Sequence, residues 1–270
     1  MMKELGAVEE TMLIPLYARA VTTRSGLFHD PCAVRIVEAL DYNFRRLADR
    51  THVLGSVFRT AMFDEMLGAF LRRCPRATIV EIGAGLNARF ERVDNGMLQW
   101  IDVDLPNVMR LRRQFFRETR RRRMVTSSVL DPDWIEPVIR AGGPYFVIAE
   151  GVFGYLPADH VKRALTLIAE QLPTARVAFD TTANEGCEHG KPVCPGLRAR
   201  LAWECDDPHE VERWGLGYRL LESRALADLT PSILRALPFP YRSALAVSHV
   251  LGWKIVGSRL NLYEVQRRGA

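Results

Sequence analysis

The 270-residue chain has few cysteines, five in all, and no two of them form a CxxC pair. An odd number at irregular spacing fits reduced thiols better than a disulfide framework, so we expect a cytoplasmic protein. Zinc-ligand residue types do gather in one stretch, at Cys187, His189, Cys194 and Cys205. Because tetrahedral zinc sites usually show the paired spacing that is missing here, we expect unpaired cysteines and a loop histidine, and no metal.

Long apolar runs are also missing, and no run approaches the length of a membrane span, so we expect no membrane partner. The first segment carries acidic residues where a signal peptide carries basic ones. The net charge is small, since 37 basic residues against 32 acidic ones leave +5. Much of this excess lies in the run 117–123, which we interpret as the solvated end of a helix. The broad basic face of a nucleic-acid-binding protein is lacking.

The residues that are present predict one globular α/β domain, since 48% of them are hydrophobic. Short β-rich runs alternate with helical patterns, which is typical of parallel βαβ units. We expect helices on both faces of a Rossmann-like, mostly parallel, seven-stranded sheet. The expected helices cover residues 55–73, 107–122 and 158–171. The expected strands cover residues 77–82, 98–103, 124–130, 145–149, 176–180, 217–223 and 259–266.

Within this single domain, covering 1–270, we distinguish four regions by their composition. An N-terminal helical region covers 1–75, and a cofactor-binding core covers 76–182. The following region, 183–257, begins as an irregular stretch rich in glycine and proline, and we expect it to form a cap over the substrate. Residues 258–270 carry the final strand.

A glycine turn follows the first expected strand. Gly83 and Gly85 allow the backbone to turn tightly and to approach a ligand closely. The segment 83–88 also satisfies the dinucleotide-binding pattern GxGxxA, and Asp104 lies about 20 residues further on, where a ribose-binding carboxylate is expected. The turn by itself is therefore compatible with a nicotinamide-dependent dehydrogenase.

Glu81, immediately before the turn, favours a different cofactor, because burying a carboxylate without a cationic partner is costly. The amino group and sulfonium of S-adenosylmethionine would supply positive charge, whereas a pyrophosphate would be repelled. We choose Asp104 as the ribose ligand, since it is nearer the carboxyl end of its strand, where ligands of open α/β sheets collect. Its neighbour Asp102 is expected to be a surface or edge carboxylate.

Several stretches, the turn included, resemble the leucine carboxyl methyltransferase family, which includes bacterial O-methyltransferases of natural-product pathways such as the tetracenomycin one. They occur in family order over about the first two thirds of the chain. The matching stretches are 17–20, 29–31, the helix with Arg59, 81–86, 102–106, 128–131 and 150–156. The resemblance implies a class I methyltransferase fold and transfer of a methyl group from S-adenosylmethionine, leaving S-adenosylhomocysteine.

The resemblance also implies roles for residues around the amino-acid tail of the cofactor. Arg19 and Arg59 would face its carboxylate, as suits two guanidinium groups. Glu150 would reach its amino end, while Gly83 and Gly85 would line the turn. The acceptor implied is a small polyketide-like molecule that is methylated on a carboxylate or a hydroxyl, that is, an acid or a phenol.

At the other end of the cofactor, the resemblance implies that Asp104 holds the ribose and that Ser128 and Val129 flank the adenine. Tyr155 would contact the acceptor. The family's eukaryotic members carry an Asp-Leu pair in place of Ser128 and Val129, and a lysine in place of Arg19. The first difference removes a carboxylate near the adenine, and the second keeps the positive charge but changes its geometry.

The chemistry of methyl transfer leaves the acceptor open. A carboxylate, with a pKa of about 4, is already ionised at neutral pH and needs no general base. A phenol would benefit from a base, for which the candidates are His160, His189 and His209; an acceptor carboxylate could be clamped by Arg198, Arg200, Arg219 or Arg242. A non-catalytic protein that binds the cofactor and serves another enzyme stays an alternative, as does the dehydrogenase.

Overall fold

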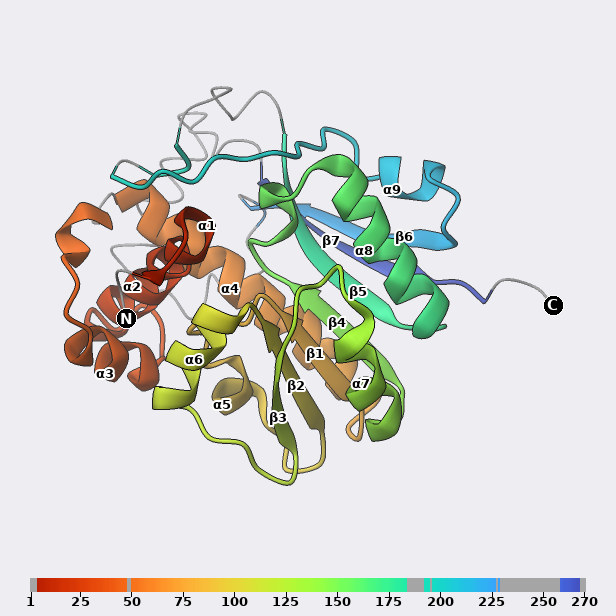
Figure 1. Ribbon diagram of the computed structural model, residues 1–270, viewed down its shortest axis with the longest axis horizontal. Helices are drawn as coiled ribbons and strands as arrows, with labels where there is room; N and C mark the ends of the chain where they lie inside the picture. Colours follow the sequence, from red (N-terminus) through yellow and green to blue (C-terminus); the bar gives the residue numbers. More distant parts are fainter. Residues whose placement is uncertain are drawn as a thin grey trace.

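The computed structural model describes residues 4–47, 50–183, 192–194, 196–226, 228 and 258–267. Their strands form one sheet in the order β3-β2-β1-β4-β5-β7-β6, in which β7 runs antiparallel to both of its neighbours. This confirms the predicted α/β fold with a mostly parallel, seven-stranded sheet (Figure 1). The strands are β1 (Thr78–Ile82), β2 (Gln99–Asp104), β3 (Arg122–Thr126), β4 (Tyr145–Ala149), β5 (Arg176–Thr182), β6 (Tyr218–Ala225) and β7 (Ser258–Val265).

Helices connect and cover these strands, and their ends follow local sequence signals. The Asp30 side chain accepts a hydrogen bond from the Ala33 N–H, with Pro31 at the first position of the helix, which is a favourable N-terminus. The α-helices of the described residues are α1 (Ala7–Glu10), α2 (Leu13–Arg24), α3 (Pro31–Ala39), α4 (Arg50–Leu71), α5 (Arg89–Val93), α6 (Pro106–Phe115), α7 (Ile135–Ala141), α8 (Ala158–Gln171) and α9 (Glu210–Arg213).

The two faces of the sheet carry separate hydrophobic clusters, because successive side chains of a strand point to opposite faces. On one face, α7 and α8 pack on β1, β2, β4 and β5; the predicted apolar positions of α8, Val161, Ala164, Leu165 and Ile168, are all buried there. On the other face lies α4, with Met62, Phe63 and Leu67 buried against the sheet. A third cluster joins α2 and α3 to α6 beside the glycine turn. Figure 1 shows α1, α2 and α3 grouped at one side of the sheet.

The basic run 117–123 is exposed at residues 117–120 and 123, as predicted, but it is not the end of a helix, so that part of the prediction was wrong. Helix α6 ends at Phe115, and Phe116 already has an extended backbone. The run instead leads into β3, where Arg122 is buried and Arg123 is exposed, as alternation in a strand requires. Arg122 can be buried in β3 because its guanidinium forms an ion pair with Asp102.

Asp102 is likewise not a surface or edge carboxylate, because its side chain is fully buried beneath the sheet's carboxyl edge. Its Oδ1 accepts from Arg112 at 2.9 Å and from the Trp100 indole at 2.8 Å, while Oδ2 accepts from Arg122 at 2.8 Å. Two buried arginines therefore neutralise one buried aspartate, which is a pattern that the sequence prediction did not anticipate.

Among the described helices, none is both long and apolar enough to cross a membrane. About half of the predicted cap, 183–257, lies outside the described residues. Its described part includes the stretch 196–205, whose backbone runs over the loop after β4: the N–H groups of Ala202 and Trp203 donate to the Gly154 carbonyl.

Candidate functional site

A cavity of about 1140 Å³ lies at the carboxyl edge of the parallel strands, below the N-terminal helices. Its lining includes the residues for which the sequence predicts a role in binding or catalysis, namely Arg19, Arg59, Glu81, Gly83, Gly85, Asp104, Ser128, Val129, Glu150 and Tyr155. Because these residues come from segments far apart in the chain, their convergence on one cavity is a result of the tertiary fold.

The glycine turn at the end of β1 requires its glycines. Gly83 and Gly85 have φ angles of 64° and 47°, in the left-handed region. A Cβ on Gly83 would lie 2.4 Å from Cγ2 of Val152, and a Cβ on Gly85 would lie 3.1 Å from Cβ of Met12. The turn is thus held between the loop after β4 and the N-terminal helices, with no room for a side chain at Gly83.

Asp104 lies at the end of β2 and is fixed by the turn. Its Oδ2 accepts from the Gly85 N–H and its Oδ1 from the Leu105 N–H, each at 2.7 Å. A carboxylate has about four acceptor positions, so capacity remains on the side that lines the cavity. Burial raises the pKa of Asp104 to about 6, against the opposing effect of these two N–H donors.

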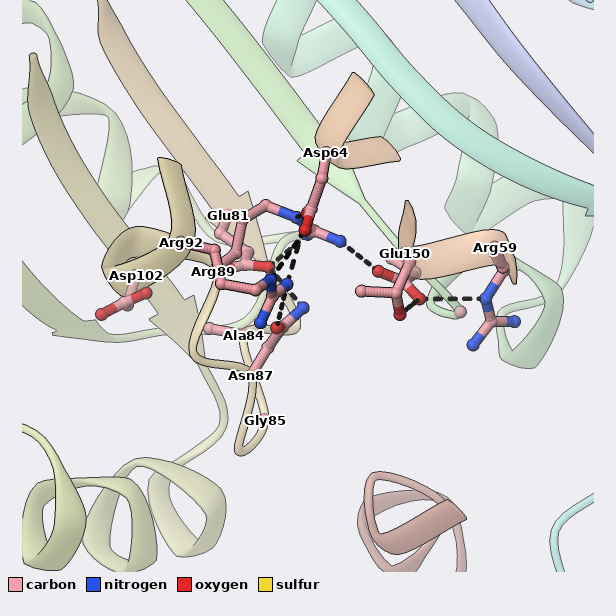
Figure 2. A network of polar contacts seen from close by, with 12 residues as sticks. Arg59, Asp64, Glu81, Ala84, Gly85, Asn87, Arg89, Arg92, Asp102 and Glu150 are labelled. Carbon is pink, nitrogen blue, oxygen red and sulfur yellow. Dashed lines mark hydrogen bonds and ion pairs between the residues drawn. The ribbon is translucent and has the colours of Figure 1, made fainter. Parts of the chain in front are cut away.

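Glu81 has a cationic partner within the protein, contrary to the reasoning that assigned this role to the cofactor. Arg89 Nη1 lies 2.5 Å from Glu81 Oε1, and Asn87 donates to the same oxygen at 3.0 Å (Figure 2). The other oxygen, Oε2, is buried, and no described residue donates a hydrogen bond to it. Burial raises the pKa of Glu81 to about 7 despite Arg89.

Glu150, just after β4, is held by three donors. Arg89 and Arg59 both form ion pairs with it, the latter at 3.1 Å, and the Thr60 hydroxyl donates to it at 2.8 Å. Burial alone would raise the pKa of Glu150, but Arg89 and Arg59 outweigh that effect and lower the pKa to about 2. Glu150 is therefore ionised at neutral pH.

The two predicted arginines line the cavity while paired with carboxylates of the protein. Arg19 is buried, forms an ion pair with Asp30 at 2.9 Å and donates to the Leu86 carbonyl. Arg59 contacts Asp180 at 3.1 Å in addition to Glu150. These contacts orient both guanidinium groups and use two of the five N–H donors of each, so donors remain to bind a further oxygen.

The remaining predicted residues lie at two other parts of the cavity wall. Ser128 and Val129 follow β3, and the Ser128 hydroxyl accepts from the Leu130 N–H at 3.2 Å. Tyr155 ends a short 3-10 helix, Phe153–Tyr155, after β4. Burial raises the pKa of the Tyr155 phenol, so it is neutral at neutral pH and is unsuited to act as a base.

Sequence reasoning missed Arg89, Thr60 and Asp180, which hold the predicted residues from behind. The signals that could have found them were weak. Arg89 lies four residues after Gly85, Asp180 ends a predicted strand at the ligand-binding edge, and Thr60 lies on a helix that was read for its apolar face. His52, which also lines the cavity, was missed because nothing in its local sequence distinguishes it.

Other sequence candidates lie elsewhere. Neither His160 nor His209 is among the described lining residues, and the same holds for the proposed clamps Arg198, Arg200 and Arg219. Arg219 instead pairs with Glu264. Three further candidates, Cys187, His189 and Arg242, lie outside the described residues. Cys194 and Cys205 are both buried, and within the described part of the chain no group of metal-ligand residue types is gathered.

Comparison with known proteins gives consistent results. A family model described as leucine carboxyl methyltransferase matches residues 12–169. The tetracenomycin polyketide synthesis O-methyltransferase TcmP of Streptomyces glaucescens is 32% identical over 240 residues, covering 87% of this chain and 88% of that protein. The S-adenosyl-L-methionine-dependent methyltransferase dpfgK of Gibberella zeae is 29% identical over 247 residues, covering 80% and 82%. A solved putative methyltransferase from Thermobifida fusca shares the fold, with a TM-score of 0.57 at 15% identity and coverage of 92% and 94%.

Proposed function

Because this chain belongs to the leucine carboxyl methyltransferase family and is an S-adenosylmethionine-dependent O-methyltransferase, we propose that its cavity binds the cofactor and a small-molecule acceptor together. The acceptor that we propose is an acid or a phenol of the natural-product type, and no nucleic acid. The observation that carries the proposal is that the ten residues to which the resemblance gives a role around cofactor and acceptor, counting Glu81, all line one cavity.

The side chains of the cavity fit the charges of the cofactor. Glu81 offers a buried oxygen, Oε2, to which no described residue donates, and Glu150 beside it is ionised. Both suit the ammonium group of the methionine part, while Arg19 and Arg59 suit its carboxylate. A pyrophosphate at the same place would meet two carboxylates, which argues against a dinucleotide.

The rest of the cofactor would follow the edge of the sheet. Gly83 and Gly85 bring the backbone close to it, and the remaining acceptor positions of Asp104 suit the two ribose hydroxyls. Ser128 and Val129 would flank the adenine, since they lie after β3, the next strand along the edge from β2.

The bound cofactor supplies an electrophilic methyl group on a sulfonium. The protein then has to align an acceptor oxygen with that methyl group and exclude water. Met12 and neighbouring residues of the N-terminal helices line the cavity beside the turn, and Leu156 and Leu201 add apolar walls. An acid needs no base; a phenol would benefit from one, and among the described lining residues His52 is the histidine. Tyr155 would contact the acceptor as a neutral phenol.

Binding and turnover test the proposal directly. Calorimetry should show that S-adenosylhomocysteine binds with a single site per chain. Incubation with S-adenosylmethionine and a panel of aromatic acids and phenols should yield a product heavier by one methyl group in place of a proton. Binding without turnover on any acceptor would favour the non-catalytic partner protein; no binding, together with co-purified nicotinamide nucleotide, would favour the dehydrogenase.

Cofactor affinity is expected to depend on pH near neutrality, since the pKa of Glu81 is about 7. Below that pH, Glu81 carries a proton in the free protein, and an ammonium must displace it to pair with the carboxylate. The Kd of S-adenosylhomocysteine should therefore rise as the pH falls below 7, approaching about tenfold per unit, and should level off above 7.

Glu81→Gln provides the control, because it keeps the shape of the side chain and removes its titration. This variant should bind more weakly and show only the smaller pH dependence that comes from Asp104, whose pKa is about 6. Calorimetry of the wild type in buffers of different ionisation enthalpy should detect proton release on binding at about pH 6. A wild-type Kd that is constant between pH 6 and 8, within about twofold, would contradict the assignment of Glu81.

A further inference from the structure

Arg89 is the centre of the charge network behind the cavity. It is the first residue of α5, directly after the glycine turn, and its side chain is 0% exposed. Its guanidinium contacts carboxylates from three separate elements: Asp64 of α4 at 2.6 Å, Glu81 of β1 at 2.5 Å, and Glu150 after β4. Figure 2 shows Arg89 between Glu81, Asp64 and Glu150, so that one side chain ties the turn to two other segments.

Arg89 stands behind the cavity wall, whereas two of its partners form part of that wall. Glu81 and Glu150 line the cavity, but Arg89 is not among the described lining residues. Each of the two carboxylates has a second polar contact that orients it, from Asn87 to Glu81 and from Thr60 to Glu150. Arg89 is therefore the ion-pair partner that Glu81 and Glu150 share.

Other charges surround this arrangement on every side. Arg92 of α5 shares Asp64 with Arg89, and Arg59 of α4 shares Glu150 with it. Arg112 and Asp102 also act electrostatically on Glu81, the first lowering its pKa and the second raising it. Since none of these cations contacts Glu81 and Glu150 together, removing Arg89 would leave two buried like charges facing the same space, and they would repel each other or take up protons.

We propose that Arg89 is the positioning residue for the ammonium group of the cofactor, because it aligns Glu81 and Glu150 side by side at the cavity wall. This inference rests on the proposed function. It assigns Arg89 no contact with the cofactor: the guanidinium acts through the two carboxylates, and Oε2 of Glu81, to which no described residue donates, is the acceptor for the ammonium.

Two ligands separate a positioning role from a merely structural one. S-adenosylhomocysteine carries the amino-acid tail, while 5′-methylthioadenosine has the same adenosine part without that tail. By calorimetry, Arg89→Met should weaken the binding of S-adenosylhomocysteine by about 10- to 100-fold. Its affinity for 5′-methylthioadenosine should stay within about twofold of that of the wild type. Arg89→Lys keeps the charge but cannot bridge three carboxylates, so its loss should be intermediate.

Arg122→Met is the matched control. Arg122 is also a buried arginine with two ion pairs, to Asp102 and Glu91, and it contacts neither Glu81 nor Glu150. The variant Arg122→Met should lower the melting temperature, as Arg89→Met should, but it should not change the affinity for either ligand. If Arg89→Met does not fold, the affinities of Arg89→Lys and Arg122→Lys for the two ligands are compared instead.

Two results would overturn the role of Arg89. The Arg89 variants could lose affinity for both ligands equally, which would indicate a structural role alone, or they could lose affinity for neither ligand. A wild-type protein that binds 5′-methylthioadenosine but not S-adenosylhomocysteine would also overturn it, because no tail site would exist. If the wild type binds neither ligand, the proposed cofactor cavity itself is wrong, and this outcome is distinguishable from the others.

Discussion

Replacing Asp104 with alanine is expected to weaken the binding of S-adenosylhomocysteine by about 100-fold. Two ribose hydroxyls would lose a charged acceptor, and hydrogen bonds to charged groups contribute about 1.5–3 kcal/mol each. The turn would lose an anchor as well, since Oδ2 of Asp104 accepts from the Gly85 N–H. Calorimetry at a temperature well below the melting point measures the change.

Asp104→Asn isolates the contribution of the charge, because an amide oxygen can still accept one hydrogen bond while the charge is lost. Its affinity should lie between those of the wild type and the alanine variant. If Asp104→Ala binds S-adenosylhomocysteine as tightly as the wild type does, the ribose is held elsewhere and the cavity has been assigned the wrong orientation.

Replacing Asp102 with alanine should have the opposite profile, with a large loss of stability and little change in affinity. Asp102 is fully buried between Arg112 and Arg122, so its removal leaves two buried guanidinium groups without their shared carboxylate. Breaking such a buried pair typically costs about 3–5 kcal/mol, which corresponds to a decrease in melting temperature of about 10 °C.

The affinity of this variant should be retained within about threefold of the wild type, because Arg112 still donates to the carbonyls of Ala84 and Gly85 and so supports the turn. Thermal unfolding followed by circular dichroism, with Asp104→Ala measured in parallel, checks the stability. A melting temperature close to that of the wild type would mean that the pairs of Asp102 contribute nothing net.

These two aspartates illustrate how far sequence reasoning reaches in the site. Both lie on β2, and the position of Asp104 at its carboxyl end was sufficient to predict that it lines the cavity. The burial of Asp102 was not predictable from its strand, because its partners come from a helix and from an edge strand. The prediction for the run 117–123 failed for the same reason. Seven mostly charged residues were expected to be solvated, but one of them, Arg122, is buried and pairs with Asp102.

Glu81 shows the same limit at the cofactor site. Its sequence context correctly indicated a buried carboxylate in need of a cation. Which cation it meets depends on the path of the chain after the turn, and α5 returns Arg89 to within 2.5 Å of it. Glu150 and Asp64, which share Arg89, are more than a dozen residues away in either direction, so no local pattern could have connected them.

The fold class, the glycine turn and the residue types around it follow from local properties of the chain, namely strand periodicity and backbone freedom at Gly83 and Gly85. Which charges meet depends on the tertiary fold. Buried ion pairs form between segments brought together by packing of the hydrophobic clusters, and their partners are chosen by distance in space. The arrangement of Arg89 between Glu81, Glu150 and Asp64 is therefore a consequence of the folded sheet.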